Sequence, residues 1–202
     1  MKKIVLAFMV AACAFAQKPE KPLKNGLYAI FKTEFGDMKA ILYEKDTPRA
    51  VSLFVNLAQG QQGFRDVDGK IVKRAYYDNT TFFRIVPGDA VQGGSLTGAT
   101  NYQCGLQIKD EFLPGIKFRF GSLAIANSGA ADSGGCQFFF ALQQKASWDG
   151  KYTIFGNLVE GDDVLRQLGH VPVHGESPDN PPKLISVTFQ RVGPPPAQKT
   201  KK

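Results

Sequence analysis

One arginine in an apolar run is the first residue of this sequence whose type and place suggest chemistry. Arg84 lies in TTFFRIV, a run of β-branched and aromatic residues that predicts a half-buried strand. A permanent charge in such a strand needs a partner, or a cleft in which it faces a ligand, because an unpaired buried charge is costly. Gln92 follows beyond a Pro-Gly pair. The arginine, the glutamine and the aromatic residues around them are therefore the candidates for a binding site.

The rest of the chain offers no conventional catalytic constellation. His170 and His174 are separated by Pro172, which breaks the helical spacing that would put two metal ligands on one face. The sequence has no G-x-S-x-G elbow and no glycine-rich phosphate loop. Asp110 and Glu111 are adjacent, and adjacent residues of a strand point to opposite faces. We therefore expect structural or solvent-facing roles for these residues, and neither a metal nor a cofactor.

Short strands are the main elements that must position the candidate residues. Residues 26–43 predict a hairpin, and six more strand-like runs follow along the chain. A helix is predicted over residues 48–59, with Thr47 as its cap. A second helix is predicted over residues 162–168, with Asp162 as its cap. Many short strands with turns between them favour a sandwich or a barrel, and two isolated helices could cover the ends of a barrel.

Both ends of the chain differ from the part that folds. Residues 1–16 begin with lysines, continue as a short apolar stretch and finish in small residues, which is typical of a secretory signal peptide cleaved before Gln17. The alternative is a lipoprotein signal cleaved before Cys13, which would anchor the domain to a membrane. Either signal places the domain outside the cytoplasm, in a periplasm or secreted. Residues 17–25 are a predicted linker, and residues 194–202 a disordered basic tail.

The remaining residues, 26–193, suit a single domain with little net charge. The whole chain of 202 residues carries +7, but two lysines leave with the signal and three belong to the tail. The balance, about +2 over residues 17–193, is too small to argue for a nucleic-acid partner. Cys104 and Cys136 match no zinc spacing. An oxidising compartment permits a disulfide between them without requiring one.

Three blocks of the sequence, taken together, resemble a known family. YYDNTTFFRIVPGDAVQGG, GSLAIANSGAADSGGCQFFFAL and WDGKYTIFGNLVEG are similar, in this order, to the blocks of the cyclophilins, which are peptidyl-prolyl cis-trans isomerases. The resemblance runs from about Gly26 to Val192. It implies an all-β fold: a closed eight-stranded antiparallel barrel capped by two α-helices, with the site on the outer wall.

The resemblance also implies a reaction and the residues that perform it. Arg84 matches the catalytic arginine of the family, which stabilises the twisted X-Pro amide without any covalent intermediate. Gln92 matches the glutamine that steadies this arginine, and Phe139 matches the floor of the proline pocket. The other substrate-binding positions implied by the match are Phe82, Asp89, Ala90, Ala126, Asn127, Gln137, Trp148 and Tyr152.

Some positions depart from the family pattern. Most members have Phe-Met where this chain has Asp89 and Ala90, so two large apolar contacts in the proline pocket are missing. Asp89 could pair with Arg84 and partly neutralise it, or point to solvent and leave a shallower pocket. Trp148 could fill some of the lost volume. We expect a working isomerase that is weaker or differently selective, and Ser147, at a position where tryptophan is common, puts cyclosporin sensitivity in doubt.

The resemblance bears on the cysteines as well. In the family fold the stretches that carry Cys104 and Cys136 both border the groove beside the proline pocket, which keeps a disulfide and two free thiols open as alternatives. The expected function is an exported, monomeric foldase that needs no cofactor and acts on unfolded or proline-containing polypeptides. The alternative is a binding module or holdase on the same barrel, with catalysis weakened by Asp89 and Ala90.

Overall fold

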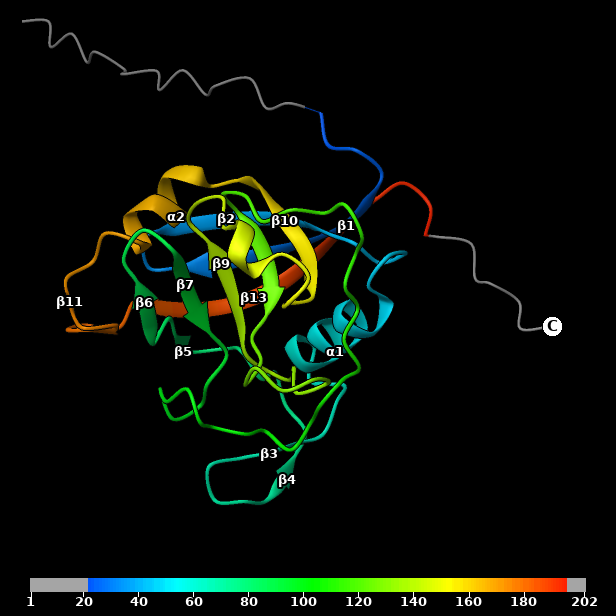
Figure 1. Cartoon of the computed structure of the whole chain (residues 1–202). Helices are drawn as coiled ribbons and strands as arrows, with labels where there is room; N and C mark the ends of the chain where they lie inside the picture. The colour runs from blue at the N-terminus through cyan, green and yellow to red at the C-terminus, as the bar shows by residue number, and fades with distance from the viewer. Residues whose placement is uncertain (1–21, 196–202) are drawn as a thin grey trace, which may run out of the picture.

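The computed structural model describes residues 22–195, which form a curled antiparallel β-sheet with an α-helix near each end (Figure 1). The predicted signal 1–16, with Cys13, lies outside the described residues, as does the greater part of the 17–25 linker and of the 194–202 tail. The elements in chain order are β1 (Gly26–Thr33), β2 (Gly36–Leu42), α1 (Pro48–Ala58), β3 (Phe64–Arg65), β4 (Ile71–Val72), β5 (Thr80–Thr81), β6 (Arg84–Val86), β7 (Ala90–Gly93), β8 (Ser122–Ile125), β9 (Phe138–Ala141), a 3₁₀ turn (Ala146–Trp148), β10 (Ile154–Glu160), α2 (Asp162–Leu168), β11 (Val173–His174), β12 (Ser177–Pro178) and β13 (Lys183–Val192).

Nine strands form the main sheet, in the order β5-β13-β1-β2-β10-β8-β9-β7-β6. This corrects the prediction of a closed eight-stranded barrel, because β5 and β6 are the two edges of an open, curled sheet. The run TTFFRIV explains the difference, since it is not one strand. Phe82 and Phe83 separate β5, which pairs with β13, from β6, which pairs with β7. The two edges of the sheet therefore follow one another in the chain with only two phenylalanines between them.

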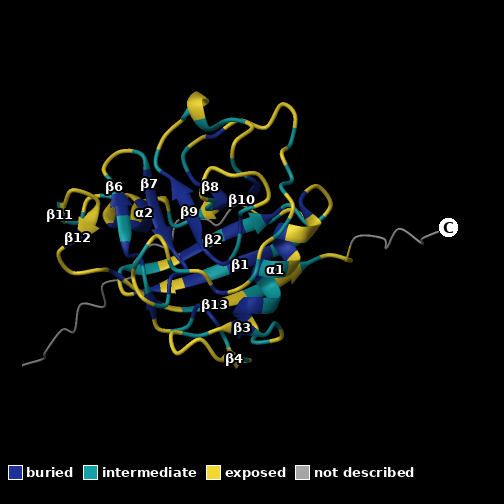
Figure 2. Cartoon of the chain, turned by 60° about the horizontal axis from the view of Figure 1, so that its bottom comes forward, coloured by how far each residue is buried: buried dark blue, intermediate teal, exposed yellow. Residues whose placement is uncertain are grey.

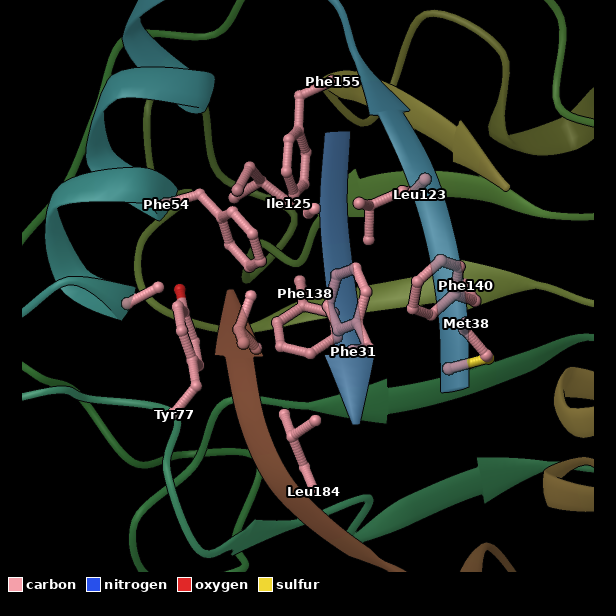
Figure 3. Packing of buried hydrophobic residues seen from close by; sticks show 14 of the residues in the cluster. Phe31, Met38, Phe54, Tyr77, Leu123, Ile125, Phe138, Phe140, Phe155 and Leu184 are labelled. Atoms are coloured by element: carbon pink, nitrogen blue, oxygen red, sulfur yellow. The ribbon is translucent and has the colours of Figure 1, made fainter. Parts of the chain in front are cut away.

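Aromatic side chains fill the inside of the curled sheet (Figure 3). The rings of Phe31 and Phe140 meet edge-on with centroids 5.0 Å apart, and Phe54 of α1 meets Phe138 edge-on at 5.6 Å. Such pairs add about 0.5–1.5 kcal/mol each beyond the burial of their area. Side chains of a strand alternate between its two faces, so Phe138 and Phe140 enter this core while Phe139 points out of it.

Helix α1 begins with a cap that the sequence did not predict. The hydroxyl of Thr47 donates to the Tyr43 carbonyl at 3.2 Å and makes no capping bond to the helix. The carboxylate of Glu111 takes that role, accepting from the backbone N–H groups of Arg49 and Ala50 at 3.1 and 2.9 Å. A carboxylate at this end satisfies orphan donors and complements the helix dipole. Glu111 therefore ties α1 to the segment before β8.

Helix α2 lies at the opposite end of the curled sheet from α1, and both helices bury side chains in the same core (Figures 1 and 2). Its N-cap is Gly161 rather than the predicted Asp162, which is the first helical residue. Gly161 has a φ of 90°, and a Cβ at this position would lie 2.6 Å from the Asp37 carbonyl oxygen. Only glycine avoids both the strain and the collision, so the close approach of β2 fixes where α2 begins.

Two short hairpins extend from the main sheet. Strands β3 and β4 form one, and β11 and β12 form the other between α2 and β13. Figure 2 shows the β11–β12 hairpin as mostly exposed, and β12 lies against β6. Between residues 22 and 195 no helix is long and apolar enough to cross a membrane.

Candidate active site

A row of side chains crosses four adjacent strands on the outer face of the sheet. The register places Arg84 of β6 opposite Gln92 of β7, Gln92 opposite Phe139 of β9, and Phe139 opposite Ala124 of β8. Residues directly opposite one another in a sheet share a face, so these four side chains lie together although the chain separates them. Arg84, Gln92 and Phe139 line a cleft of about 590 Å³.

The guanidinium of Arg84 is held from two directions. Its Nη1 donates to Oε1 of Gln92 at 2.9 Å, and its Nε donates to Oε2 of Glu176 at 2.6 Å. The side chains of Arg84 and Glu176 keep 34% and 48% of their surface exposed, so the pair lies at the rim of the cleft. Within residues 22–195 Nη2 forms no hydrogen bond, which leaves its N–H groups for a bound molecule.

Gln92 belongs to a chain of hydrogen bonds that fixes the orientation of its amide. Its Nε2 donates to Oε1 of Gln137 at 2.7 Å. Gln137 in turn donates from Nε2 to the carbonyls of Thr100 and Tyr102, at 3.1 and 3.0 Å. Both glutamines are buried. Because each amide presents its nitrogen to one neighbour and its oxygen to the other, the oxygen of Gln92 must face Arg84.

A disulfide fixes the two segments that carry this chain. Cys104 and Cys136 are bonded, with Cα atoms 6.3 Å apart, and both line the cleft. Cys104 follows the loop whose carbonyls accept from Gln137, and Cys136 precedes Gln137 itself. The Tyr77 hydroxyl donates to the Cys136 carbonyl at 3.0 Å, and burial raises the pKa of Tyr77. The disulfide therefore joins this loop covalently to the segment that leads into β9, beside the site.

Aromatic rings surround the apolar part of the cleft. Phe139 stacks on Phe118 at 5.8 Å and receives the edges of Trp148 and Tyr152 at 5.4 and 5.2 Å. Phe139, Trp148 and Tyr152 line the cleft together with Ala90, whose small side chain leaves room above the floor. The cleft thus has an apolar pocket with aromatic walls directly beside the Arg84 row.

Asp89 turns away from this pocket. Its carboxylate accepts hydrogen bonds from Lys145 Nζ and, at 2.6 Å, from Gln143 Nε2. The hydrogen bond from Lys145 is the main reason that the pKa of Asp89 is lowered. Lys145 also lies over the ring of Trp148, with Nζ 5.4 Å from the ring centroid. Both expectations for Asp89 are therefore corrected, since it is neither paired with Arg84 nor free in solvent.

Phe82 and Asp89 are the two predicted site residues that do not line the cleft. Phe82 is fully buried in the aromatic core, where its ring meets Phe138 edge-on at 6.3 Å. Alternation along an unbroken strand would place it on the same face as Arg84, but the strand is interrupted between β5 and β6. The predicted residues that do line the cleft are Arg84, Ala90, Gln92, Ala126, Asn127, Gln137, Phe139, Trp148 and Tyr152.

Glu176 is a charged residue of the cleft that the sequence did not predict. It is separated from Arg84 by 92 positions, in a hairpin without apolar periodicity, and no spacing rule connects the two. The remaining ionisable residues do not assemble into a metal site, since no group of three His, Cys, Asp or Glu residues between positions 22 and 195 is placed to hold an ion. His174 contacts Asp179 on the surface of the β11–β12 hairpin.

The sequence matches the family model described as cyclophilin type peptidyl-prolyl cis-trans isomerase/CLD over residues 28–189. The chain belongs to the cyclophilin family. The match runs from within β1 to within β13, so it includes all or part of every strand in the sheet that carries the Arg84 row. Similarity to solved structures agrees: a cyclophilin-type peptidyl-prolyl cis-trans isomerase of Cryptosporidium parvum superposes with a TM-score of 0.69 at 26% identity, covering 82% of this chain and 98% of the other. A crystal structure of the same protein in the presence of the dipeptide Ala-Pro gives a TM-score of 0.69 at 27% identity, covering 82% and 99%.

Two curated relatives show how the cyclophilin domain is used in chains of different length. Peptidyl-prolyl cis-trans isomerase-like 1 of Gibberella zeae is 33% identical over 167 residues, which cover 81% of this chain and 93% of the relative. The spliceosome-associated protein CWC27 homolog of Danio rerio is 38% identical over 174 residues, covering 83% of this chain. That match spans only 33% of the length of the Danio rerio protein.

Proposed function

We propose that this cyclophilin accelerates cis-trans isomerisation of X-Pro peptide bonds and that Arg84 stabilises the transition state. The observation that carries the proposal is the position of a fixed guanidinium beside an aromatic pocket, with Nη2 free of partners among the described residues. The pocket around Phe139 accepts the proline ring, and the guanidinium faces the bond that rotates. The Cryptosporidium parvum relative was crystallised in the presence of the dipeptide Ala-Pro, which supports a proline-containing ligand.

The physical basis is differential binding of the twisted amide. The planar X-Pro bond is held by resonance, with a barrier of about 18–20 kcal/mol to rotation. At the twisted transition state the proline nitrogen becomes pyramidal and presents a lone pair that the planar ground state lacks. A donor from Arg84 gains a hydrogen bond only in that state, which lowers the barrier without any covalent step. A preorganised planar fork suits this task better than a flexible ammonium.

Substrate backbone would be held by the residues beside the row. Ala126 follows β8 and lines the cleft, and its N–H donates to the Gln137 carbonyl at 2.9 Å, which ties it to β9. The Asn127 side chain donates to the Lys151 carbonyl at 2.8 Å and accepts from the Gly129 N–H at 3.1 Å, which braces the loop at the rim. We propose that an extended peptide lies along this rim, with its proline in the pocket.

The family substitutions at Asp89 and Ala90 alter the pocket without disabling Arg84. The Asp89 carboxylate accepts hydrogen bonds from Lys145 and Gln143 and therefore does not pair with the Arg84 guanidinium. Ala90 removes apolar surface, and Trp148 restores part of it through its contact with Phe139. We infer a working isomerase with a wide pocket, whose selectivity for the residues next to proline differs from that of members with Phe-Met.

A proline-peptide binding module is the second candidate, and two observations favour it. Ala90 leaves less apolar contact for the ring, and Glu176 partly balances the charge of Arg84. Such a module would bind proline-containing chains without accelerating isomerisation of their X-Pro bonds.

We propose further that the protein acts on exported polypeptides outside the cytoplasm, as a monomer. The Cys104–Cys136 disulfide supports this, because structural disulfides persist in oxidising compartments. The N-terminal lysines followed by an apolar stretch support it as well. Cleavage before Cys13 instead of Gln17 would place the same domain on a membrane through a lipid anchor.

Exchange NMR on a short X-Pro peptide tests the isomerase proposal, using residues 17–202 beside Arg84→Ala. The uncatalysed interconversion takes tens to hundreds of seconds, so even slow catalysis is visible. We expect activity in the wild type and a loss of about 10²-fold or more in Arg84→Ala, the range measured for removal of one transition-state donor. Peptide binding without any exchange enhancement in the wild type would establish the binding module instead.

A further inference from the structure

The β11–β12 hairpin carries an acidic residue to the catalytic arginine. Val173 pairs with Pro178 and His174 with Ser177, which leaves Gly175 and Glu176 as a two-residue turn. Gly175 has a φ of 65°, a conformation that glycine adopts without strain and that tight hairpin turns require. Glu176 is therefore fixed at the tip of the hairpin.

This tip is attached to β6 through both its backbone and its side chain. The Ile85 N–H donates to the Glu176 carbonyl at 2.8 Å, and Arg84 Nε donates to Glu176 Oε2 at 2.6 Å. Two consecutive residues of β6 thus bond to one residue of the hairpin. The hydrogen bond between the Ile85 N–H and the Glu176 carbonyl fixes the backbone of Glu176 beside β6. The Glu176 carboxylate is therefore held close to Arg84 even before the ion pair forms.

The base of the hairpin is braced independently. The Asp179 N–H donates to the Pro172 carbonyl at 3.1 Å, and the Asp179 carboxylate contacts His174. These contacts hold the hairpin together without involving the cleft. A change at Glu176 can therefore remove the contact to Arg84 while the hairpin keeps its own closure.

Two fixed acceptors determine the plane of a planar group. Gln92 accepts from Nη1 and Glu176 accepts from Nε, and the guanidinium is a rigid fork, so these bonds together set where Nη2 lies. With Gln92 alone, the guanidinium could pivot about a single hydrogen bond.

We propose that Glu176 is a positioning residue for isomerisation: it fixes the Arg84 guanidinium so that Nη2 meets the proline nitrogen of the twisted amide. The inference rests on the proposed isomerase function and adds a residue to it. Its effect is on turnover, because Glu176 acts through Arg84, whereas the proline pocket is built around Phe139, which lies beyond Gln92 in the row. Binding of the planar peptide should change little when Glu176 is altered.

The experiment compares Glu176→Ala, Glu176→Gln and Glu176→Asp with the wild type by exchange NMR on one X-Pro peptide. We expect Glu176→Ala to lower kcat/KM by about tenfold, equal to about 1.4 kcal/mol. Glu176→Gln should lose less, because an amide oxygen can still accept from Nε, and Glu176→Asp should recover part of the rate by keeping the charge. The peptide Kd should stay within about twofold, since the loss lies in the transition state.

Glu44→Gln is the matched control, because Glu44 forms an ion pair with Arg191 that is also a carboxylate on a guanidinium but lies away from the cleft. The Arg84 Nε–H resonance gives a direct readout: it should be slow to exchange with water in the wild type and in Glu44→Gln, and fast in Glu176→Ala. Thermal unfolding of each variant checks that the fold is retained.

Two results would overturn the inference separately from the isomerase proposal. An active wild type with Glu176→Ala at the rate of Glu44→Gln would show that Gln92 alone positions Arg84. A rate increase in Glu176→Ala would show that the carboxylate restrains the arginine rather than aiming it. A silent wild type would refute the isomerase proposal itself, and the role of Glu176 with it.

Discussion

Gln137→Leu is the substitution that tests whether the chain of amides behind Arg84 sets its orientation. Leucine has a similar size but neither donates nor accepts a hydrogen bond. The change removes the 2.7 Å bond from Gln92 and the two bonds of 3.1 and 3.0 Å to the Thr100 and Tyr102 carbonyls. Gln92 then keeps only its contact with Arg84, and its amide is free to turn its nitrogen towards the guanidinium.

The cost can be worked out from burial. The Nε2 of Gln92 is in a buried side chain, and an unsatisfied buried donor costs about 1–3 kcal/mol. Thr100 and Tyr102 line the cleft, so we expect water to replace the donor that their carbonyls lose, at little further cost. A loss of about 2 kcal/mol in a domain of this size lowers the Tm by about 4–8 °C. One weakened hydrogen bond to a charged group is worth about 1.5 kcal/mol, so the catalytic rate should fall by about tenfold.

Exchange NMR on an X-Pro peptide gives the rate, and differential scanning calorimetry gives the Tm. Gln62→Leu is the control, because Gln62 also donates from Nε2 to a backbone carbonyl, that of Gly63 at 3.0 Å, but lies outside the cleft. In an Arg84→Ala background Gln137→Leu should cost no further activity, since its effect passes through the arginine. A drop in Tm without any loss of rate relative to Gln62→Leu would refute the reasoning, because it would show that Gln137 serves stability alone.

Three further predictions follow from the site. Asp89→Asn should destabilise the protein at about pH 7 but not in acid. Because the pKa of Asp89 is lowered, its contribution is present above the ordinary value of 3.8 and is lost as the pH falls through the folded value, so the unfolding free energies of the two proteins in urea should approach one another as the pH falls below 3.8. Reduction of the Cys104–Cys136 disulfide, which spans 32 positions, should lower the free energy of unfolding by about 3.7 kcal/mol in the chain-entropy account. Thiol titration of residues 17–202, unfolded without reductant, should find no free thiol, and free thiols would contradict the structure. Trp148→Ala should weaken binding of a proline peptide by about tenfold, because about 1.4 kcal/mol of half-buried aromatic contact is lost, and turnover of the bound peptide should change little. Unchanged affinity in a calorimetric titration would exclude Trp148 from the pocket.

Strand patterns and the block resemblance predicted much of the framework. The hairpin at residues 26–43 and both helices lie close to where the sequence pattern placed them. Helix boundaries were close because Pro48 and the glycines near each end act locally. Thr47 holds the predicted N-cap position of α1, but the capping hydrogen bonds come from Glu111, 61 positions from Ala50. The prediction of Asp162 as the cap of α2 was wrong, because the close approach of β2 requires a glycine at position 161. Local rules have no access to such contacts.

The sequence by itself determined which side chains could share the outer face. Side chains alternate along a strand, so Phe139 points to the outer face while Phe138 and Phe140 point into the core. It also determined, through the resemblance, that Arg84, Gln92 and Phe139 belong to one site. Only the tertiary structure decided what surrounds that arginine. The break between β5 and β6 turns Phe82 into the core, Lys145 draws Asp89 away from Arg84, and the β11–β12 hairpin supplies Glu176. The physical reason is that a side chain forms its hydrogen bonds with whatever the fold brings within about 3 Å, and that choice depends on strand register and loop closure rather than on neighbours in the chain.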